Sequence, residues 1–375
     1  MKQAGYDMLY LSVCALNGVQ PDAEKTASMD LDKLYKMCRF HSMTAIVCYA
    51  LEMAGVKPEQ KWMEEKAKAI RKIVLLDTER KKILDFMEQN GIWYMPMKGI
   101  LLKELYPKLG MRQMADNDIL YDEKFQAQVA AFMKQNGYTA ESVGKGNHDV
   151  YPKEPVYNFE LHRNLFSKSM HADILEYYAD VKQRLKKDSG NQYGFHFSDE
   201  DFYIYMIVHE YKHYSNSGTG LRSLMDDFVY LRAKGEKLDW TYIGNELQKL
   251  GVAEFEQKSR TLSSKLFSDS ECSTLTAAER EILEEYLFSG TYGTVQKTVE
   301  KRMELFKEST GKVSKFRYLW SRLFPNMEFY KKYYPFFYQH KYLLPAVWIY
   351  RFFRGVAGKS AKIRKEIHIV KNMDR

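Results

Sequence analysis

Two aspartates one residue apart, Asp116 and Asp118, are the residues of this chain whose type and spacing most favour chemistry. The apolar run Ile119-Leu120-Tyr121 follows them and predicts a strand. Because residues i and i+2 of a strand point to the same side, both carboxylates should face one point in space. Two ionised carboxylates held that close repel each other, and a bound divalent cation is the usual relief. The pair therefore predicts a metal site.

The segment before the two acids predicts the elements that position them. The apolar run Ile92–Met97, bounded by glycines, is typical of a buried strand. Lys98-Gly99 predicts a turn, and Ile100–Tyr106 predicts a short helix that ends at Pro107.

This stretch resembles the core of the nucleotidyltransferase superfamily built on the DNA polymerase β-like fold. More narrowly, it resembles a bacterial family of mostly uncharacterised nucleotidyltransferases. The pattern of that family is a Lys-Gly turn, a helix ending in Tyr-Pro, and Arg-x-Met-x-Asp-x-Asp before an apolar run. The matching residues here are Lys98, Gly99, Tyr106, Pro107, Arg112, Met114, Asp116 and Asp118.

The superfamily also uses a third acid on a later strand, and Glu160 in Asn-Phe-Glu-Leu-His-Arg is the best match. His162 falls two residues later, on the same strand face. One departure is Asn117, which stands between the two aspartates where the superfamily commonly has an apolar residue. Asn117 should point away from the metal side and alter packing rather than chemistry.

The resemblance implies a Mg²⁺-dependent enzyme that moves a nucleoside monophosphate from an NTP to an acceptor. Two Mg²⁺ ions, about 3.5–4 Å apart, neutralise the triphosphate in such reactions and require hard oxygen ligands. Asp116, Asp118 and Glu160 are then the catalytic and metal-binding residues. The acceptor stays open between a protein hydroxyl, a small molecule or sugar, and an RNA end.

Lys98, Gly99 and Arg112 are the candidates for phosphate binding. Gly99 lets the backbone approach the phosphates, and the start of the following helix offers amides and the positive end of its dipole. Lys98 and Arg112 supply positive charge. Lys212 and His213 belong to a His-x-x-Lys-His segment similar to one in the family, and should lie across the nucleotide cleft or make structural hydrogen bonds.

Three other patterns allow alternative chemistry. The segment His209–His213 matches the zinc pattern H-E-x-x-H, but its histidines share a face with Phe202 and Met206 and no third ligand is evident, so a zinc peptidase is disfavoured. His148 and His162 are open between a metal-adjacent or substrate-facing role and a hydrogen-bonded place in the core. No phosphate-binding P-loop pattern occurs.

The expected fold is α+β, with a small mixed-sheet polymerase β-like core flanked by helical regions. We expect an N-terminal helical region over 1–90, the catalytic core over 91–197, a C-terminal helical domain over 198–310 and a basic, aromatic-rich tail over 311–375. Further strands are expected at His148–Tyr151 and Val156–His162. Helical periodicity is expected at Leu31–Tyr49, Glu59–Gln89, Asp199–Tyr214, Leu221–Ala233, Trp240–Leu250, Ala253–Phe267, Ala277–Phe288 and Thr294–Lys307.

The tail differs from the rest of the chain in charge. Residues 301–375 hold 18 Lys and Arg against 5 Asp and Glu, a net of +13, whereas the whole chain carries +8. Aromatic residues are interleaved with these charges, which suits a nucleic-acid backbone or an anionic membrane surface. The alternative is a basic helical segment that is partly packed.

Composition indicates a cytoplasmic protein, with peripheral membrane association through the tail as an open alternative. The four cysteines have no paired spacing, and no apolar run is long enough for a transmembrane helix. The apolar run Met8–Leu16 lacks the flanks of a signal peptide. Besides the enzyme, two functions stay open: a catalytically degenerate nucleotide- or nucleic-acid-binding protein, and a membrane-surface protein that acts through its tail.

Overall fold

A computed structural model describes residues 1–144, 146–168, 170–268, 274–291, 293–294, 296–300, 303, 315–358, 366 and 368–370. The chain forms two compact units. The first comprises Met1–Lys212 and Gly220–Thr291, and the second comprises 213–219 and the chain from residue 292 onward. The elements that bear on the candidate site belong to the first unit.

Five helices precede the first strand. The apolar pattern over Leu31–Tyr49 divides into two helices because Ser42 adopts a left-handed backbone conformation with φ 53°. The long charged stretch predicted over Glu59–Gln89 forms one helix. It ends before Gly91, because the φ of 68° at Gly91 lies outside the range of a right-handed helix. The five are α1 (Lys2–Asn17), α2 (Ala23–Ala27), α3 (Leu31–His41), α4 (Thr44–Met53) and α5 (Gln60–Gln89).

The central sheet has four strands in the order β1-β2-β4-β3. They are β1 (Tyr94–Pro96), β2 (Asn117–Tyr121), β3 (His148–Lys153) and β4 (Tyr157–His162). β1 is antiparallel to β2, β2 is parallel to β4, and β3 is antiparallel to β4, so the sheet is mixed. The fold is therefore α+β with a small mixed sheet, as the sequence predicts.

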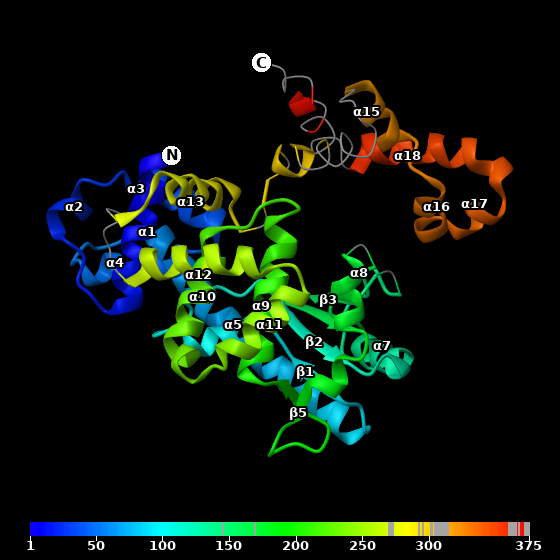
Figure 1. Cartoon of the computed structure of the whole chain (residues 1–375), viewed down its shortest axis with the longest axis horizontal. Coiled ribbons are helices and arrows are strands. Elements are labelled where there is room, and N and C mark those ends of the chain that lie inside the picture. Colours follow the sequence, from blue (N-terminus) through cyan, green and yellow to red (C-terminus); the bar gives the residue numbers. More distant parts are fainter. Residues whose placement is uncertain are drawn as a thin grey trace. The chain divides into compact units, whose positions relative to one another are not determined.

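Helices cover both faces of this sheet (Figure 1). In β2 and β4, side chains at odd positions, such as Ile119 and Phe159, join the core formed with α5 and α7 (Gln126–Gln135). Leu120, at an even position, joins the core formed with α8 (Ala172–Tyr177) and α9 (Asp199–Tyr214). The alternation of strand side chains thus sends Asp118 and Glu160 toward the α9 face.

Short elements connect the strands. The turn at Lys98 leads into α6 (Gly99–Leu102) and a 3-10 turn, η1 (Lys103–Leu105), where the sequence predicts one short helix. Asp122 accepts a hydrogen bond from the Lys124 amide and opens the 3-10 turn η2 (Glu123–Phe125) before α7. A second, two-stranded sheet pairs β5 (Leu185–Lys187) with β6 (Phe195–Phe197) after the 3-10 turn η3 (Val181–Arg184).

The helices after the sheets begin and end close to the predicted residues. Ser198 Oγ accepts a hydrogen bond from the Asp201 amide at 3.1 Å and caps the start of α9. The others in the first unit are α10 (Leu221–Lys234), η4 (Gly235–Lys237), α11 (Trp240–Lys249), α12 (Ala253–Ser268) and α13 (Ala277–Ser289).

The regular elements described in the second unit are α-helices and a 3-10 turn. Val299, Met303, Tyr318 and Val370 form its small buried cluster. The predicted helix Thr294–Lys307 is helical at 296–300, and most of its later half lies outside the described residues. The remaining elements are α15 (Lys315–Leu323), α16 (Met327–Tyr333), α17 (Pro335–Gln339), η6 (Lys341–Leu343) and α18 (Leu344–Gly358). Among the described helices, none has the length and apolarity needed to span a bilayer.

Candidate active site

Asp118 and Glu160 are neighbours across the parallel pair β2/β4. The register aligns Asp118 with Glu160, and both side chains lie on the sheet face toward α9. Asp118 is only 3% exposed, whereas the Glu160 side chain keeps 22% of its exposure. The sheet therefore holds one fully buried and one more accessible carboxylate side by side.

Two nitrogen donors converge on a single oxygen of Asp118. Lys98 Nζ lies 2.6 Å from Asp118 Oδ1, and His162 Nε2 lies 2.8 Å from the same atom. Burial alone would raise the pKa of Asp118, but Lys98 and His162 outweigh it and hold the pKa well below its usual range. Burial also disfavours the charged form of Lys98, but the carboxylate of Asp118 outweighs this effect and raises the pKa of Lys98 above its ordinary value. The two groups form a buried ion pair.

The backbone at Lys98 has an uncommon conformation that serves this pair. Its φ of 53° and ψ of −121° are rarely adopted by a residue with a side chain. Gly99 follows, and a Cβ at Gly99 would lie 2.4 Å from Arg112 Nη1 and 3.0 Å from the side chain of Met114. The Lys-Gly turn thus combines a strained lysine aimed at Asp118 with a glycine that leaves room for Arg112.

Asp116 precedes β2 and carries negative charge that nothing nearby fully balances. Burial and the neighbouring Asp118 raise its pKa to about 6, and Glu160 acts in the same direction, against the opposing effect of Lys98. A carboxylate pair of this kind favours a bound cation. Asp116 to Asp118 do not form an exposed turn, because Asn117 and Asp118 are buried in β2.

Asn117 points to the opposite face, as the sequence predicts. Its Oδ1 accepts a hydrogen bond of 2.8 Å from Arg80 Nη1 of α5, and Arg80 also pairs with Asp77 at 2.7 Å. Asn117 therefore ties β2 to the helix behind the sheet and leaves the α9 face to the acids.

Arg112 lies in a buried ion pair rather than in an open position. Its Nε and Nη2 donate to the two oxygens of Asp226 of α10 at 2.8 and 2.9 Å. The Tyr106 hydroxyl donates to Asp226 at 2.7 Å. Because the guanidinium is 8% exposed and bidentate, this geometry favours support of the acid-bearing segment over the predicted phosphate contact.

The segment Gln113–Asp116 is held from several sides. The Gln113 carbonyl accepts from Arg222 Nη1 of α10 at 3.2 Å, and Gln113 Oε1 accepts from the Ala45 amide of α4 at 3.1 Å. Lys72 Nζ of α5 donates to the Ala115 carbonyl at 2.7 Å. The sequence did not single out Lys72, because its helical spacing resembles that of any surface lysine.

Helix α9 covers the acids with Tyr205 and Lys212. Burial lowers the pKa of Lys212 and the charge of Lys98 acts in the same direction, against the weaker opposing effects of Glu160 and Asp118. The Lys212 ammonium is therefore close enough to interact with all three groups. Tyr205 is 1% exposed, feels the same charges, and its hydroxyl has no hydrogen-bond partner in the described structure. Sequence reasoning missed Tyr205 because it stands in an apolar helical stripe. His213 belongs to the second unit.

Glu210, the acid of the H-E-x-x-H pattern, is engaged inside the helical core. Its carboxyl accepts from the Tyr286 hydroxyl at 2.9 Å, and Ser259 Oγ donates to the neighbouring Asp227 at 2.9 Å. Burial raises the pKa of Glu210 to about 7. This placement removes Glu210 from the role of a base beside a zinc ion.

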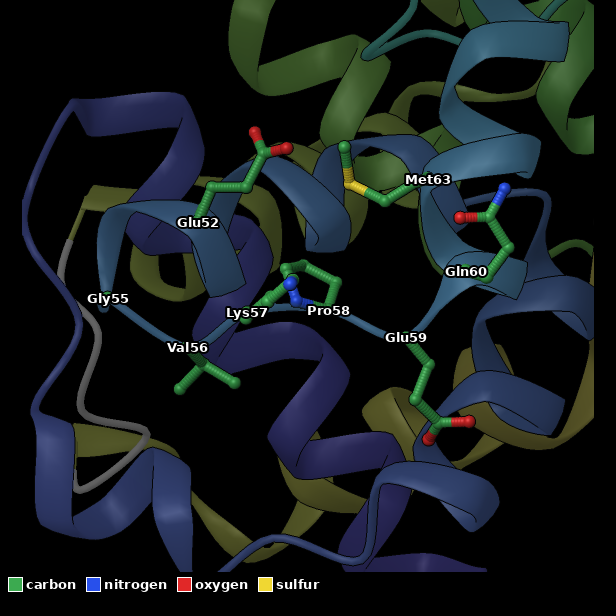
Figure 2. A pocket seen from close by; sticks show the side chains of 8 residues that line it. All are labelled: Glu52, Gly55, Val56, Lys57, Pro58, Glu59, Gln60 and Met63. Carbon is green, nitrogen blue, oxygen red and sulfur yellow. The ribbon is translucent and has the colours of Figure 1, made fainter.

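A surface hollow of about 790 Å³ lies elsewhere, in the connection between α4 and α5 (Figure 2). Residues between Glu52 and Met63 line it, and none of them belongs to the acid cluster. Its acids Glu52 and Glu59 pair with Lys66 and Lys61. Among the described residues that line it, the hollow therefore has no unpaired acid that could bind a metal ion, and we place the candidate site at Asp116, Asp118 and Glu160.

Asp118 and Glu160 lie side by side on one sheet face, and both act electrostatically on Asp116. Carboxylate oxygens are the hard donors that Mg²⁺ prefers, so these three acids suit a divalent cation by their chemistry. The raised pKa of Asp116 and the unpartnered hydroxyl of Tyr205 are two further signs of a place prepared for a ligand. Among the described residues, the group of His, Cys, Asp or Glu side chains close enough together to hold one ion is His148, Glu160 and His162, whose ligand atoms all lie within 4.8 Å of one another.

A family model described as an uncharacterised nucleotidyltransferase matches residues 27–268, which is more than half of the chain. The match spans the sheet, the acids and the helices α3 to α12. No curated protein and no solved structure matches the chain.

Removing the charge of Arg112 should destabilise the fold strongly. Arg112→Met leaves the buried Asp226 without its cation, which costs about 3–5 kcal/mol when a buried pair loses one partner. Urea unfolding followed by circular dichroism measures the loss. Lys124→Met, which removes an exposed pair with Asp122, is the matched control and should cost less than about 1 kcal/mol. Equal losses in both variants would contradict the supporting role of Arg112.

Asp116→Asn should stabilise the protein without metal at neutral pH. The pKa of Asp116 is about 6 in the folded protein against an ordinary value of 3.8, so its contribution to stability falls as pH rises through this window. At pH 7 the variant should gain about 1–3 kcal/mol, because one pKa unit corresponds to about 1.4 kcal/mol. Unfolding at pH 7 and pH 4 measures this, and the gain should vanish at pH 4. A variant less stable than wild type at pH 7 would contradict the conclusion that the ionised Asp116 carboxylate destabilises the fold.

Proposed function

The chain belongs to the family of uncharacterised nucleotidyltransferases, and we propose that Asp116, Asp118 and Glu160 are the acids with which it transfers a nucleoside monophosphate from an NTP. The observation that carries the proposal is the register of β2 and β4, which sets Asp118 beside Glu160 on the α9 face. Asp116 stands next to them with a raised pKa. The polymerase β-like core implied by the resemblance is part of this proposal, and the small mixed sheet supports it.

The reaction forms a bond between an acceptor oxygen and the α-phosphorus and breaks the bond from that phosphorus to pyrophosphate. Mg²⁺ held by the three acids would neutralise the triphosphate and polarise its oxygens. Glu160 is the accessible acid, and its lowered pKa keeps it ionised at neutral pH. It is placed to accept the proton of the acceptor hydroxyl.

The cationic side chains divide the remaining tasks. Lys98 neutralises Asp118 and fixes its orientation. Lys212 stands on α9 across from the acids, where its ammonium suits the triphosphate. The Tyr205 hydroxyl, buried beside the same charges, is available to donate to a bound phosphate or acceptor.

A catalytically degenerate binding protein is the weaker alternative. A protein that only binds nucleotides gains nothing from gathered carboxylates, which repel phosphates when no cation is bound. The raised pKa of Asp116 means that its ionised carboxylate lowers the stability of the fold at neutral pH, which is typical of a group kept for function.

The described part of the tail favours a second role at an anionic membrane surface. Trp320, Phe336, Tyr342 and Ile349 are each more than half exposed, in a segment with a large excess of Lys and Arg. Exposed aromatic and basic residues together suit the interface of an anionic bilayer. Such an attachment would bring the enzyme to an acceptor at the membrane.

Nucleotide binding tests the first proposal. Calorimetric titration of each NTP should show binding that depends on Mg²⁺, and Asp118→Asn should lose it together with the transfer of labelled nucleotide. Glu123→Gln, an exposed acid just beyond β2, is the matched control and should bind normally. Failure of the wild type to bind any NTP would overturn the proposal, as would full transfer by Asp118→Asn.

Vesicle sedimentation tests the role of the tail. The full chain should bind vesicles with anionic lipids more tightly than neutral ones, and high salt should weaken the binding. Replacing Trp320 and Tyr342 by Ser should reduce binding, whereas Trp240→Ser, an exposed tryptophan in the first unit, should not. Equal binding to neutral vesicles, or salt-sensitive binding to RNA alone, would contradict attachment to the membrane.

A further inference from the structure

A pair of histidines flanks Glu160 at the outer side of the acid cluster. His148 of β3 is aligned with His162 of β4, and their rings lie 4.8 Å apart between centroids, tilted by 37°. His162 Nε2 and His148 Nε2 are each 3.6 Å from Glu160 Oε2. Two imidazoles therefore present the same ring nitrogen to one carboxylate oxygen.

These separations suit the ligands of a small cation. Two ligands at about 2.1 Å from a tetrahedral ion stand about 3.4 Å apart, close to the 3.6 Å found for both His–Glu pairs. The three ligand atoms all lie within 4.8 Å, so small side-chain rotations would close the set. The side chains of His148 and Glu160 are 31% and 22% exposed, which leaves the outer side open to water or a substrate oxygen.

The chemistry of the donors separates this group from the three acids. Imidazole nitrogen is a common ligand of zinc, iron, cobalt and nickel, whereas Mg²⁺ takes oxygen ligands almost exclusively. We propose that His148, Glu160 and His162 bind a first-row transition-metal ion. Glu160 belongs both to this group and to the three acids proposed to bind Mg²⁺. In the transfer reaction the transition-metal ion would therefore replace one Mg²⁺, and only this statement rests on the proposed function.

The surroundings of His162 define what binding requires. Its Nε2 donates to Asp118 in the protein without metal, so an ion at this nitrogen replaces that proton and leaves Asp118 to Lys98. The remaining ring proton then lies on Nδ1, which faces the side-chain amide of Asn147 at 3.4 Å. Binding therefore includes a rotation of that amide to present its oxygen, which gives up the hydrogen bonds that Asn147 Nδ2 donates to the Asn164 and Leu165 carbonyls at 3.1 and 3.3 Å. His148 Nδ1 has no partner among the described residues, so a rotation of the ring breaks no hydrogen bond at that atom.

Titration with Co²⁺ in an excess of Mg²⁺ tests the inference, without nucleotide and on the full chain. Calorimetry should show one Co²⁺ bound, with visible absorption bands of an ion that has nitrogen ligands. His148→Asn should weaken the affinity at least about tenfold, the loss expected when a metal site is damaged. His196→Asn, which alters an exposed histidine paired with Asp188, is the matched control and should not change it.

Three outcomes would overturn the inference: no absorption bands in the wild type, equal affinity in His148→Asn, or displacement of Co²⁺ by Mg²⁺ at similar concentration. Thermal unfolding of each variant excludes loss of fold as the cause. The result is also distinct from the test of nucleotide transfer. Co²⁺ binding without NTP binding supports the site and refutes the enzyme, and NTP binding without Co²⁺ binding does the reverse.

Discussion

The buried carboxylate of Asp118 imposes the constraint on which the rest of the first unit depends. A charge removed from water in the middle of a sheet must find its counter-charge within the protein. Lys98 and His162 provide it on one oxygen, and each needs its own support. The uncommon backbone at Lys98 brings that lysine to Asp118, and Gly99 next to it leaves room for Arg112, which pairs with Asp226.

The sheet separates structure from chemistry by its alternation. One face binds α5 and α7 through apolar side chains and through Asn117, while the other carries the acids under α9. Helix α9 shows the same division: Glu210 pairs with buried polar groups, whereas Lys212, half a turn later, interacts electrostatically with Asp118 and Glu160. Asp118 and Lys212 thus each have a nearby residue in the sequence, Asn117 and Glu210, that anchors the element to a core.

Much of this could be predicted from the sequence because local rules govern it. Period two predicted that Glu160 and His162 share one face of their strand and that Asn117 points away from Asp118, and the resemblance supplied the third acid; the register that sets Asp118 beside Glu160 came from the structure. The sequence could not show that Arg112 meets Asp226 or that His148 meets His162, since both contacts join segments that only the folded chain brings together. Tyr205 and Lys72 were missed for the same reason, because their own neighbourhoods in the sequence look ordinary.

The segment Gln113–Asp116 has a consequence for how the protein can be divided. Its backbone and side chains are gripped by α4, α5 and α10, which lie on both sides of the sheet in the sequence. A fragment cut to the sheet alone would keep the three acids in its sequence and lose the contacts that hold Asp116 beside them. The smallest piece expected to keep the three acids together is therefore the intact first unit, because three distant stretches of chain hold the segment before β2 in place.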